Sequence, residues 1–341
     1  KEKKEDKSNE EAFTGEKVKS AHGAEFSSLK DEAEKKRKVV TDIFKKELPL
    51  ITRDKVDEIL RPFDDLIGLN DIKKQIRQLA YNMVAHSKRR KLNIDTDYAP
   101  SLHMVFSGNP GTGKTTVARM LGAVLKELGY LSPGHVHEVD RSALVGSYIG
   151  HTEYYTSEAL NKAKGGVLFV DEAYGLNKGF DWDFGAEAIE LIIKEMEDSR
   201  DDLVVIFAGY PEEMGWFVKM NPGLQSRIAM TLDFPDYSDD ELTNIFQQYV
   251  RDQNFVIDSL ALEKVKLMIK KMPANEKQKF GNARGVRNLF EKVLQNQATR
   301  IVEQDIEDKN DLVTILAQDV PYQMANESRA KTATISQFEN K

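Results

Sequence analysis

Apolar residues in the middle of the chain alternate between short continuous runs and longer stretches at helical spacing. The continuous runs predict four strands, at residues 103–107, 135–139, 167–171 and 203–209. Amphipathic helices are predicted around them at 70–91, 114–128, 153–164 and 186–198. Strands that are apolar throughout are typical of parallel sheets covered on both faces. We therefore expect residues 63–236 to form a doubly wound α/β domain that binds ligands at the carboxyl ends of its strands.

After Pro235 the pattern changes to helices alone, predicted at 238–252, 258–271, 283–304 and 309–317. The first of them begins with Ser238 and Glu241 at the spacing of a capping box. Residues 237–320 are thus expected to form a small all-helical domain. Residues 321–341 lack periodicity and are expected to be a flexible tail.

The N-terminal part of the chain is poor in large apolar residues. Residues 1–30 are rich in Lys, Glu, Ser and Gly and are expected to be a disordered linker. Residues 31–62 predict two short helices in an N-terminal appendage, with Pro49 between them and Pro62 ending the second. Because the sequence begins with Lys1 rather than Met, we expect it to be cut from a longer chain whose missing part carries targeting information.

Composition narrows the class of protein. A chain of 341 residues has room for two or three units. It has no cysteine, which excludes disulfides, thiolate metal sites and a cysteine nucleophile, and fits a reducing compartment. No apolar run is long enough to span a membrane and no signal segment opens the chain, so a cytoplasmic protein is expected.

The net charge of −7, from 49 basic and 56 acidic residues, counts against a dedicated nucleic-acid surface. Two basic clusters, at 35–38 and 88–91, are interpreted as solvated helix faces.

The segment GNPGTGKT at residues 108–115 fits the phosphate-loop pattern G-x-x-x-x-G-K-[ST] and lies between a predicted strand and a predicted helix. Glycines let the backbone approach phosphates, and the N–H groups at the start of the helix hold the anion. Lys114 can bridge the β- and γ-phosphates, and the Thr115 hydroxyl can ligate Mg²⁺. The alternative is a glycine-rich turn without a ligand. The residues expected to bind nucleotide here are Asn109, Pro110, Gly111, Thr112, Gly113, Lys114, Thr115 and Thr116.

The predicted strand at 167–171 ends in Asp171, which Glu172 follows. In a phosphate-loop enzyme the first acid holds Mg²⁺ and the second polarises the attacking water. Two acids at an ordinary strand end are the alternative. Combined with Lys114, the pair predicts ATP and Mg²⁺ as cofactors and a Mg-dependent ATPase, with Asp171 and Thr115 as metal ligands.

Eight segments in order resemble an AAA+ ATPase, and more narrowly the CbxX/CfqX family, which includes stage V sporulation protein K and red-type rubisco activase. They cover roughly residues 61–320 and comprise 66–76, 108–119, 140–152, 165–176, 184–198, 204–214, 221–228 and 281–288. The resemblance implies that 237–320 is the helical lid of such an ATPase. It also implies a homo-oligomer, hexameric in this family.

The resemblance also assigns binding residues. Leu66, Ile67 and Gly68 match the segment that lines the adenine pocket, although plain core packing is the alternative for them. Arg284 matches the lid arginine that contacts nucleotide within the same subunit, and Arg287, one helical turn away, is the reserve choice.

Arg227 matches the arginine finger, the cation that contacts the γ-phosphate bound by a neighbouring subunit and stabilises the transition state. A surface salt bridge is the alternative. The chain departs from the family pattern at Tyr210, where Asn, Thr or Ser commonly positions the attacking water. Tyr210 could offer a hydroxyl there or only pack.

The segment Tyr148-Ile149-Gly150 matches the loop that faces the central pore in AAA+ rings. An aromatic ring gives a large contact that tolerates any substrate sequence, and glycine lets the loop move. Packing of Tyr148 under the loop is the alternative. Residues 176–184, with Trp182, are a candidate second pore loop.

These features predict an ATP-driven ring that remodels a partner protein or partly threads it through its pore. A nucleotide-gated scaffold or adaptor in secretion or sporulation is the alternative. A DNA motor is a weaker third possibility, because the chain is acidic. The sequence names no partner.

Overall fold

In the computed structural model, residues 51–92, 94, 101–177 and 183–322 are described. The predicted linker, most of the predicted appendage and Trp182 lie outside these residues. The α/β part contains five strands, β1 (Met104–Gly108), β2 (Val136–Val139), β3 (Gly166–Val170), β4 (Leu203–Gly209) and β5 (Met230–Phe234). Its helices are α2 (Arg53–Asp64), α3 (Asn70–Lys91), α4 (Lys114–Glu127), α5 (Arg141–Leu144), α6 (His151–Ala163), α7 (Gly185–Asp198), α8 (Pro211–Lys219) and α9 (Pro222–Gln225), with a short 3₁₀ helix, η1 (Ala173–Leu176).

The five strands form one sheet in the order β2-β3-β4-β1-β5, and every pairing is parallel. Strand β1 lies between β4 and β5, with Phe106 opposite Ala208 of β4 and Leu232 of β5. The phosphate loop follows β1, and the acidic pair follows β3, two strands away. The topology thus places both at the carboxyl edge of the sheet, as the doubly wound prediction requires.

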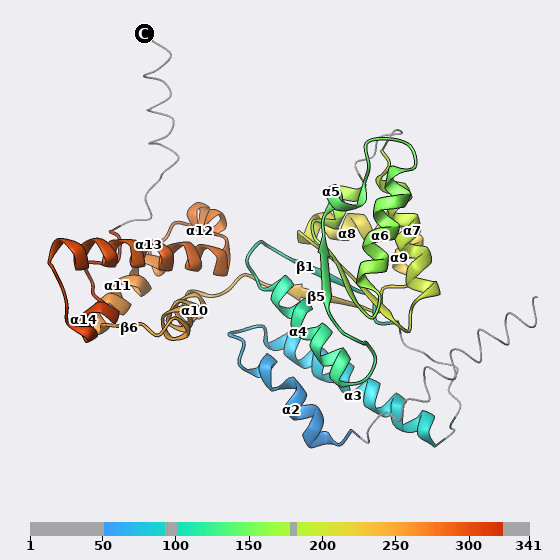
Figure 1. The fold of residues 1–341 in the computed structure, drawn as a ribbon, viewed down its shortest axis with the longest axis horizontal. Coiled ribbons are helices and arrows are strands. Elements are labelled where there is room, and N and C mark those ends of the chain that lie inside the picture. The colour runs from blue at the N-terminus through green and yellow to red at the C-terminus, as the bar shows by residue number, and fades with distance from the viewer. Residues whose placement is uncertain (1–50, 93, 95–100, 178–182, 323–341) are drawn as a thin grey trace, which may run out of the picture. The chain divides into compact units, whose positions relative to one another are not determined.

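Helices cover both faces of the sheet (Figure 1), and alternate residues of β1, β3 and β4 are buried on opposite faces. Phe106 is buried among side chains of α2, α3 and α4, whereas Val105 packs with those of α6, α7 and α8. Burial on both faces explains why β1, β3 and β4 read as continuous apolar runs. The α/β fold class is therefore confirmed.

Helix α2 corrects the expectation for Pro62. The proline was expected to end the helix, but the helix runs on to Asp64. Phe63, only 2% exposed, is packed in the same core cluster as α3 and α4, and this burial holds the last turn in place. Val56 and Leu60 are buried there too, so this helix is part of the core that surrounds β1.

The C-terminal part is helical, as predicted, with one helix that the sequence did not predict (Ala274–Phe280) and one addition of another kind. It contains α10 (Asp239–Asp252), α11 (Ser259–Lys270), α12 (Ala274–Phe280), α13 (Asn282–Glu303) and α14 (Lys309–Val313). Ser238 and Glu241 form the predicted capping box. The addition is a two-stranded parallel pair, β6 (Val256–Ile257) and β7 (Thr314–Ile315), where the sequence predicted that the last helix continues to 317.

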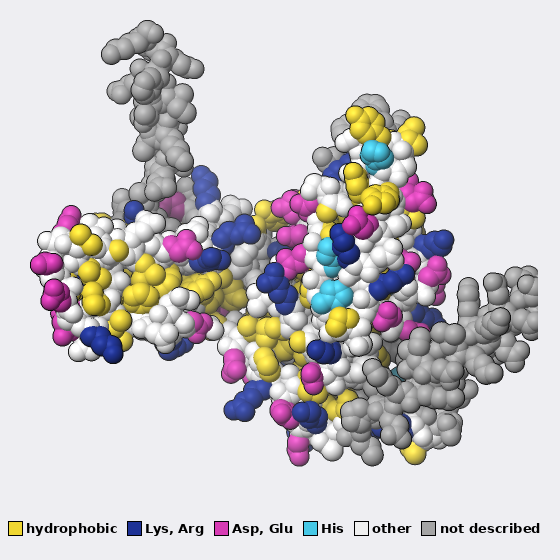
Figure 2. Space-filling model, viewed as in Figure 1, with side chains coloured by type: hydrophobic (Ala, Val, Ile, Leu, Met, Phe, Trp, Pro, Cys, Tyr) yellow, Lys and Arg dark blue, Asp and Glu magenta, His cyan; other side chains and the backbone are white. Residues whose placement is uncertain are grey.

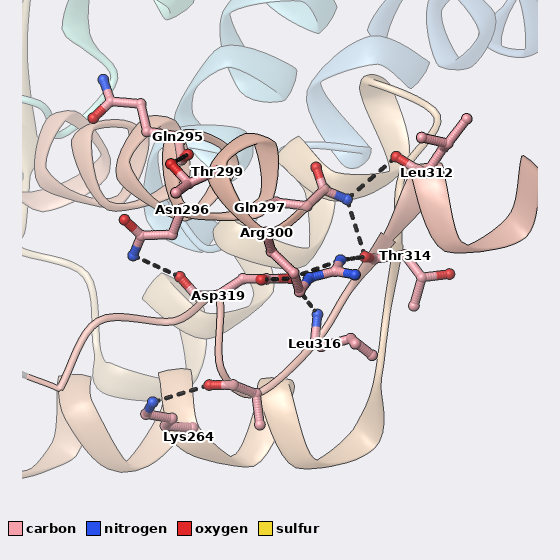
Figure 3. Close-up of polar contacts among 11 residues, drawn as sticks. Lys264, Gln295, Asn296, Gln297, Thr299, Arg300, Leu312, Thr314, Leu316 and Asp319 are labelled. Atoms are coloured by element: carbon pink, nitrogen blue, oxygen red, sulfur yellow. Dashed lines mark hydrogen bonds and ion pairs between the residues drawn. The ribbon is translucent and has the colours of Figure 1, made fainter. Parts of the chain in front are cut away.

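Buried polar contacts fix the segment after β7 to this helical domain (Figure 3). Arg300 of α13 forms a bidentate ion pair with Asp319, at 2.8 and 3.1 Å, and donates to the carbonyl of Thr314. Lys264 of α11 donates to the carbonyls of Ala317 and Val320.

In the described residues, no helix is both long and apolar enough to cross a bilayer. Basic and acidic side chains are interspersed on the face drawn in Figure 2, in keeping with the small net charge.

Candidate functional site

The phosphate loop connects β1 to α4 and lines a hollow of about 330 Å³. Gly113 is left-handed, with φ 96°, and is the N-cap of α4, whose first residue is Lys114. Gly111 is also left-handed, and a Cβ there would lie 2.2 Å from the carbonyl oxygen of Gly281. Only glycine fits this close approach between the loop and the helical domain. The loop backbone thus surrounds the N-terminus of α4, where an anion is favoured.

Lys114 extends back over the loop. Its Nζ donates to the carbonyls of Gly108 (2.7 Å) and Asn109 (2.9 Å). Burial lowers the pKa of Lys114, and Arg284 nearby lowers it further, while the Asp171 and Glu172 carboxylates oppose the shift. A partly desolvated ammonium is suited to binding a phosphate group, because water screens its charge less there.

Asp171 and Glu172 line the same hollow, across from Lys114. The Glu172 N–H donates to a carboxylate oxygen of Asp171 (3.0 Å). Glu172 has left-handed backbone angles, φ 47° and ψ 43°, which strain a residue that carries a Cβ. Strained backbone of this kind concentrates at functional sites.

Two tyrosines lie beside this acidic pair. The rings of Tyr174 and Tyr210 are 6.0 Å apart, and Tyr210 lines the hollow. Burial, and next the Glu172 carboxylate, raises the pKa of Tyr174 to about 12. Tyr174 therefore keeps its proton at neutral pH.

A second hollow, of about 200 Å³, adjoins the first and shares Gly113 and Thr116 with it. Leu66 and Ile67, which were predicted to contact adenine, line this hollow. The helical domain supplies the opposite wall, which the sequence did not reveal: Tyr237, Ile245, Gln248 and Tyr249. Tyr237 also donates from its hydroxyl to the carbonyl of Thr112 (3.2 Å). An apolar hollow of this size beside a phosphate loop suits a flat base.

Three residues that were predicted to bind nucleotide, Gly68, Asn109 and Thr112, do not line either hollow. The φ of Gly68 is 66°, and a Cβ there would lie 2.4 Å from an oxygen of Glu241. The Asn109 amide binds the Asp236 carboxylate (3.0 Å). Thr112 is fully buried and donates to the Asn109 carbonyl. The Asn109 and Thr112 side chains thus stabilise the shape of the phosphate loop, and its backbone is left to contact a ligand.

The helical domain contacts the phosphate loop directly. Ala283 donates its N–H to the Gly111 carbonyl (3.1 Å). Asn282 donates to Asp236 (2.8 Å) and to the Pro110 carbonyl (3.3 Å). Arg284 and Arg287, the preferred and the reserve choice, both line the first hollow. The two cations therefore face the same space as Lys114.

Arg227 lies away from its own phosphate loop. Its carbonyl accepts from the Ser101 hydroxyl (2.6 Å), and Ala229 donates to the His103 carbonyl, so Arg227 is at the amino end of β1. Its guanidinium forms an ion pair with Glu197 (3.3 Å). Within one chain Arg227 thus pairs with Glu197, and the predicted finger role would act on a second chain.

The loop before α6 presents an exposed apolar group. Tyr148 is 71% and Ile149 89% exposed, and Gly150, with φ 81°, starts α6. Tyr148 is in edge contact with His151, 5.3 Å between ring centroids. Apolar side chains gather at this end of α6 in Figure 2. Packing of Tyr148 under the loop is therefore not what the structure shows.

The oxygen groups in the first hollow fit Mg²⁺. Thr115 and Asp171 both line it, and hydroxyl and carboxylate oxygens are ligands that Mg²⁺ accepts when phosphate and water complete its shell. No group of three or more His, Cys, Asp or Glu side chains that could hold a metal occurs among the described residues.

Comparisons with known proteins agree with this geometry. Residues 104–236 match the ATPase family associated with various cellular activities (AAA), and residues 238–332 match the AAA lid domain. Stage V sporulation protein K of Bacillus subtilis (strain 168) is 42% identical over 265 residues, 77% of this chain and 82% of that protein. A chloroplastic ribulose bisphosphate carboxylase/oxygenase activase of Cyanidioschyzon merolae is 45% identical over 269 residues, 78% and 91% of the two chains.

A crystal structure of the FIGL-1 AAA domain in complex with ADP has a TM-score of 0.53 and 18% identity, covering 81% of this chain and 89% of that one. It supports the fold. With relatives so similar over most of their length, the chain belongs to the AAA+ ATPases of the CbxX/CfqX family and hydrolyses ATP.

Proposed function

We propose that the protein is a ring-forming, Mg-dependent ATPase that remodels a partner protein by gripping it with Tyr148 and Ile149. The observation that carries this proposal is the exposure of these two side chains on the domain that binds nucleotide. A large apolar contact left in solvent favours binding to another chain. One relative is named for sporulation and the other for activating ribulose bisphosphate carboxylase/oxygenase. Because these names differ, we propose remodelling of a protein without naming a particular partner.

In the nucleotide site, Lys114 and Arg284 bind the phosphates, and Leu66 and Ile67 contact the base. Thr115 and Asp171 would hold Mg²⁺, which supplies charge neutralisation for the phosphates when bound. Glu172 accepts the proton of the attacking water, because its carboxylate lies in the same hollow as Lys114. Tyr210, with its ring in this hollow, is the candidate for orienting that water.

An oligomer is part of the proposal because Arg227 is distant from its own site. A finger that acts on a neighbour requires a head-to-tail interface, and such interfaces form rings where the rotation between subunits closes. Six subunits are expected from the family. Loss of the γ-phosphate would change the contacts between the loop and the helical domain, through Gly111 and Ala283, and so move the ring's elements.

The test of remodelling uses casein as an unfolded model substrate, added to the full chain with ATP and Mg²⁺. We expect casein to stimulate ATP hydrolysis by the wild type. Tyr148→Phe should keep this stimulation because the ring contact remains, and Tyr148→Ala should lose it. Equal stimulation of Tyr148→Ala and wild type would refute the gripping role and favour a scaffold that only switches assembly.

A further inference from the structure

The guanidinium of Arg227 is held by its own chain on two of its three nitrogens. Nη1 donates to the Gly223 carbonyl (3.2 Å) and to the Ser226 hydroxyl (3.4 Å). Nε lies 3.3 Å from a carboxylate oxygen of Glu197. Nη2 makes no hydrogen bond to any of the described residues. Nε and Nη1 are thus held within the chain, and Nη2 is available to bind another group.

The Nε atom is unusual in its environment. It is the one buried side-chain nitrogen or oxygen without a hydrogen-bond partner in the part of the chain that the structure describes. An unpaired buried donor is unfavourable, and a carboxylate at 3.3 Å offsets this by charge. At Nε the guanidinium therefore depends on the Glu197 carboxylate, whereas neutral acceptors hold Nη1.

The backbone at Glu197 is held by the helix and by a contact of the preceding residue. It lies in the last turn of α7, and the preceding residue, Met196, accepts through its carbonyl from Nε2 of the buried His103 (2.8 Å). A carboxylate near a helix C-terminus is disfavoured by the helix dipole, so a cation beside it is stabilising. Within α7 and the turn after it, Arg200 approaches only to 3.7 Å. Arg227 at 3.3 Å is thus the nearer of the two cations beside the Glu197 carboxylate.

We propose that Glu197 is the positioning residue of Arg227: it holds the Nε side so that Nη2 can bind phosphate on a neighbouring subunit. This inference rests on the proposed finger role of Arg227. Arginine recognises phosphate through the fixed fork of its guanidinium, so its orientation decides whether the bond forms. Without Glu197, the long side chain would have to be ordered at each catalytic event, and turnover would be slower while ATP binding would not change.

The experiment compares Glu197→Gln with Glu190→Gln in the full chain. Glu190 is an exposed acid on the same helix with no ion pair among the described residues, which makes it the matched control. Steady-state hydrolysis is measured at a protein concentration where sedimentation gives the same oligomer for both. We expect Glu197→Gln to lower kcat by about two- to fivefold, the range for a partly exposed ion pair, with the KM for ATP unchanged. Glu190→Gln should leave both constants at wild-type values.

The same substitution is then made in an Arg227→Ala background, where a positioning residue has nothing left to position. No further loss is expected there. An equal loss in that background, an unchanged or higher kcat for Glu197→Gln alone, or loss of the oligomer would each overturn the inference. If Arg227→Ala itself keeps wild-type turnover, the failure lies in the proposed finger role.

Discussion

At the residue scale, Glu172 is the group whose chemistry is most specific. Glu172→Gln keeps the shape of the side chain and removes its ability to accept a proton. We expect turnover to fall by about 10²- to 10⁴-fold, the usual contribution of a general base, while ATP binding is retained. Single-turnover hydrolysis and equilibrium binding of a fluorescent ATP analogue separate the two quantities.

The control for this experiment is Glu212→Gln, an exposed acid at the start of α8 that does not line the nucleotide hollow. It should hydrolyse ATP like the wild type. Wild-type turnover by Glu172→Gln would remove the assigned role, and loss of analogue binding would mean that the carboxylate holds the site together.

The sequence predicted those residues of the first hollow that belong to short motifs. Lys114 and Thr115 are neighbours, and Asp171 follows a strand whose place in a parallel sheet is predictable. The wall that the helical domain adds to the second hollow was missed, because Tyr237 and Tyr249 belong to a capped, amphipathic domain with no nucleotide motif. Asn109 and Thr112 match the pattern, but a pattern does not distinguish a side chain that binds a ligand from one that shapes the loop.

At the scale of elements, a buried histidine connects two strands and a helix. His103, 1% exposed, accepts the Val205 N–H of β4 at Nδ1 (3.0 Å) and contacts the Met196 carbonyl of α7 through Nε2. Nδ1 as acceptor requires the neutral ring. Burial lowers the pKa of His103 below its ordinary value of 6.5.

The unfolded chain takes up a proton at His103 near pH 6.5, and the folded chain does so only at lower pH. Between these values the unfolded state binds more protons, so the free energy of unfolding falls as the pH drops below 6.5. His103→Gln can donate and accept in the same directions without titrating. Its urea-unfolding free energy should therefore decline less between pH 7 and about 5 than that of the wild type. The exposed control, His151→Gln, should follow the wild-type curve; parallel curves for all three proteins would contradict the assignment.

A second prediction at this scale concerns the ion pair that fixes the segment after β7 to the lid. The side chains of Arg300 and Asp319 are 6% and 1% exposed. Asp319→Ala leaves a buried guanidinium without its partner, and we expect a loss of about 3–5 kcal/mol of unfolding free energy. Asp71→Ala, which removes an exposed pair with Lys74, should give no measurable change. Chemical denaturation followed by circular dichroism measures both. Equal stability of the two variants would show that the segment after β7 adds nothing to the lid.

Strand β5 shows why the sheet was predicted incompletely. The prediction relied on continuous apolar runs, which suit central strands. β5 lies at the edge of the sheet, and its burial alternates, with Leu232 and Phe234 inside and polar residues between them. Five residues of alternating pattern beside short helices give too weak a signal for such a strand.

At the scale of the whole molecule, the proposed finger divides each active site between two subunits. Lys114 and Glu172 belong to the chain that binds ATP, and Arg227 to the next chain. An oligomer of Arg227→Ala subunits should then hydrolyse ATP about 10³-fold or more slowly than the wild type, although the nucleotide hollow of each subunit is intact. Glu172→Gln is inactive for the opposite reason, because it supplies a normal finger to a neighbour and lacks only its own base.

Mixing the two inactive variants therefore gives the last prediction. In co-expressed oligomers, an Arg227→Ala subunit with intact Glu172 can lie beside a Glu172→Gln subunit with intact Arg227, and that seam is complete. If the variants mix at random in a closed ring, about a quarter of the seams have this order. ATP hydrolysis should return to a comparable fraction of the wild-type rate. The control pairs Arg227→Ala with the Glu172→Gln/Arg227→Ala double variant, which cannot form a complete seam and should stay inactive. Recovery in the control, or none in either mixture when sedimentation shows mixed oligomers, would mean that each site works within one chain.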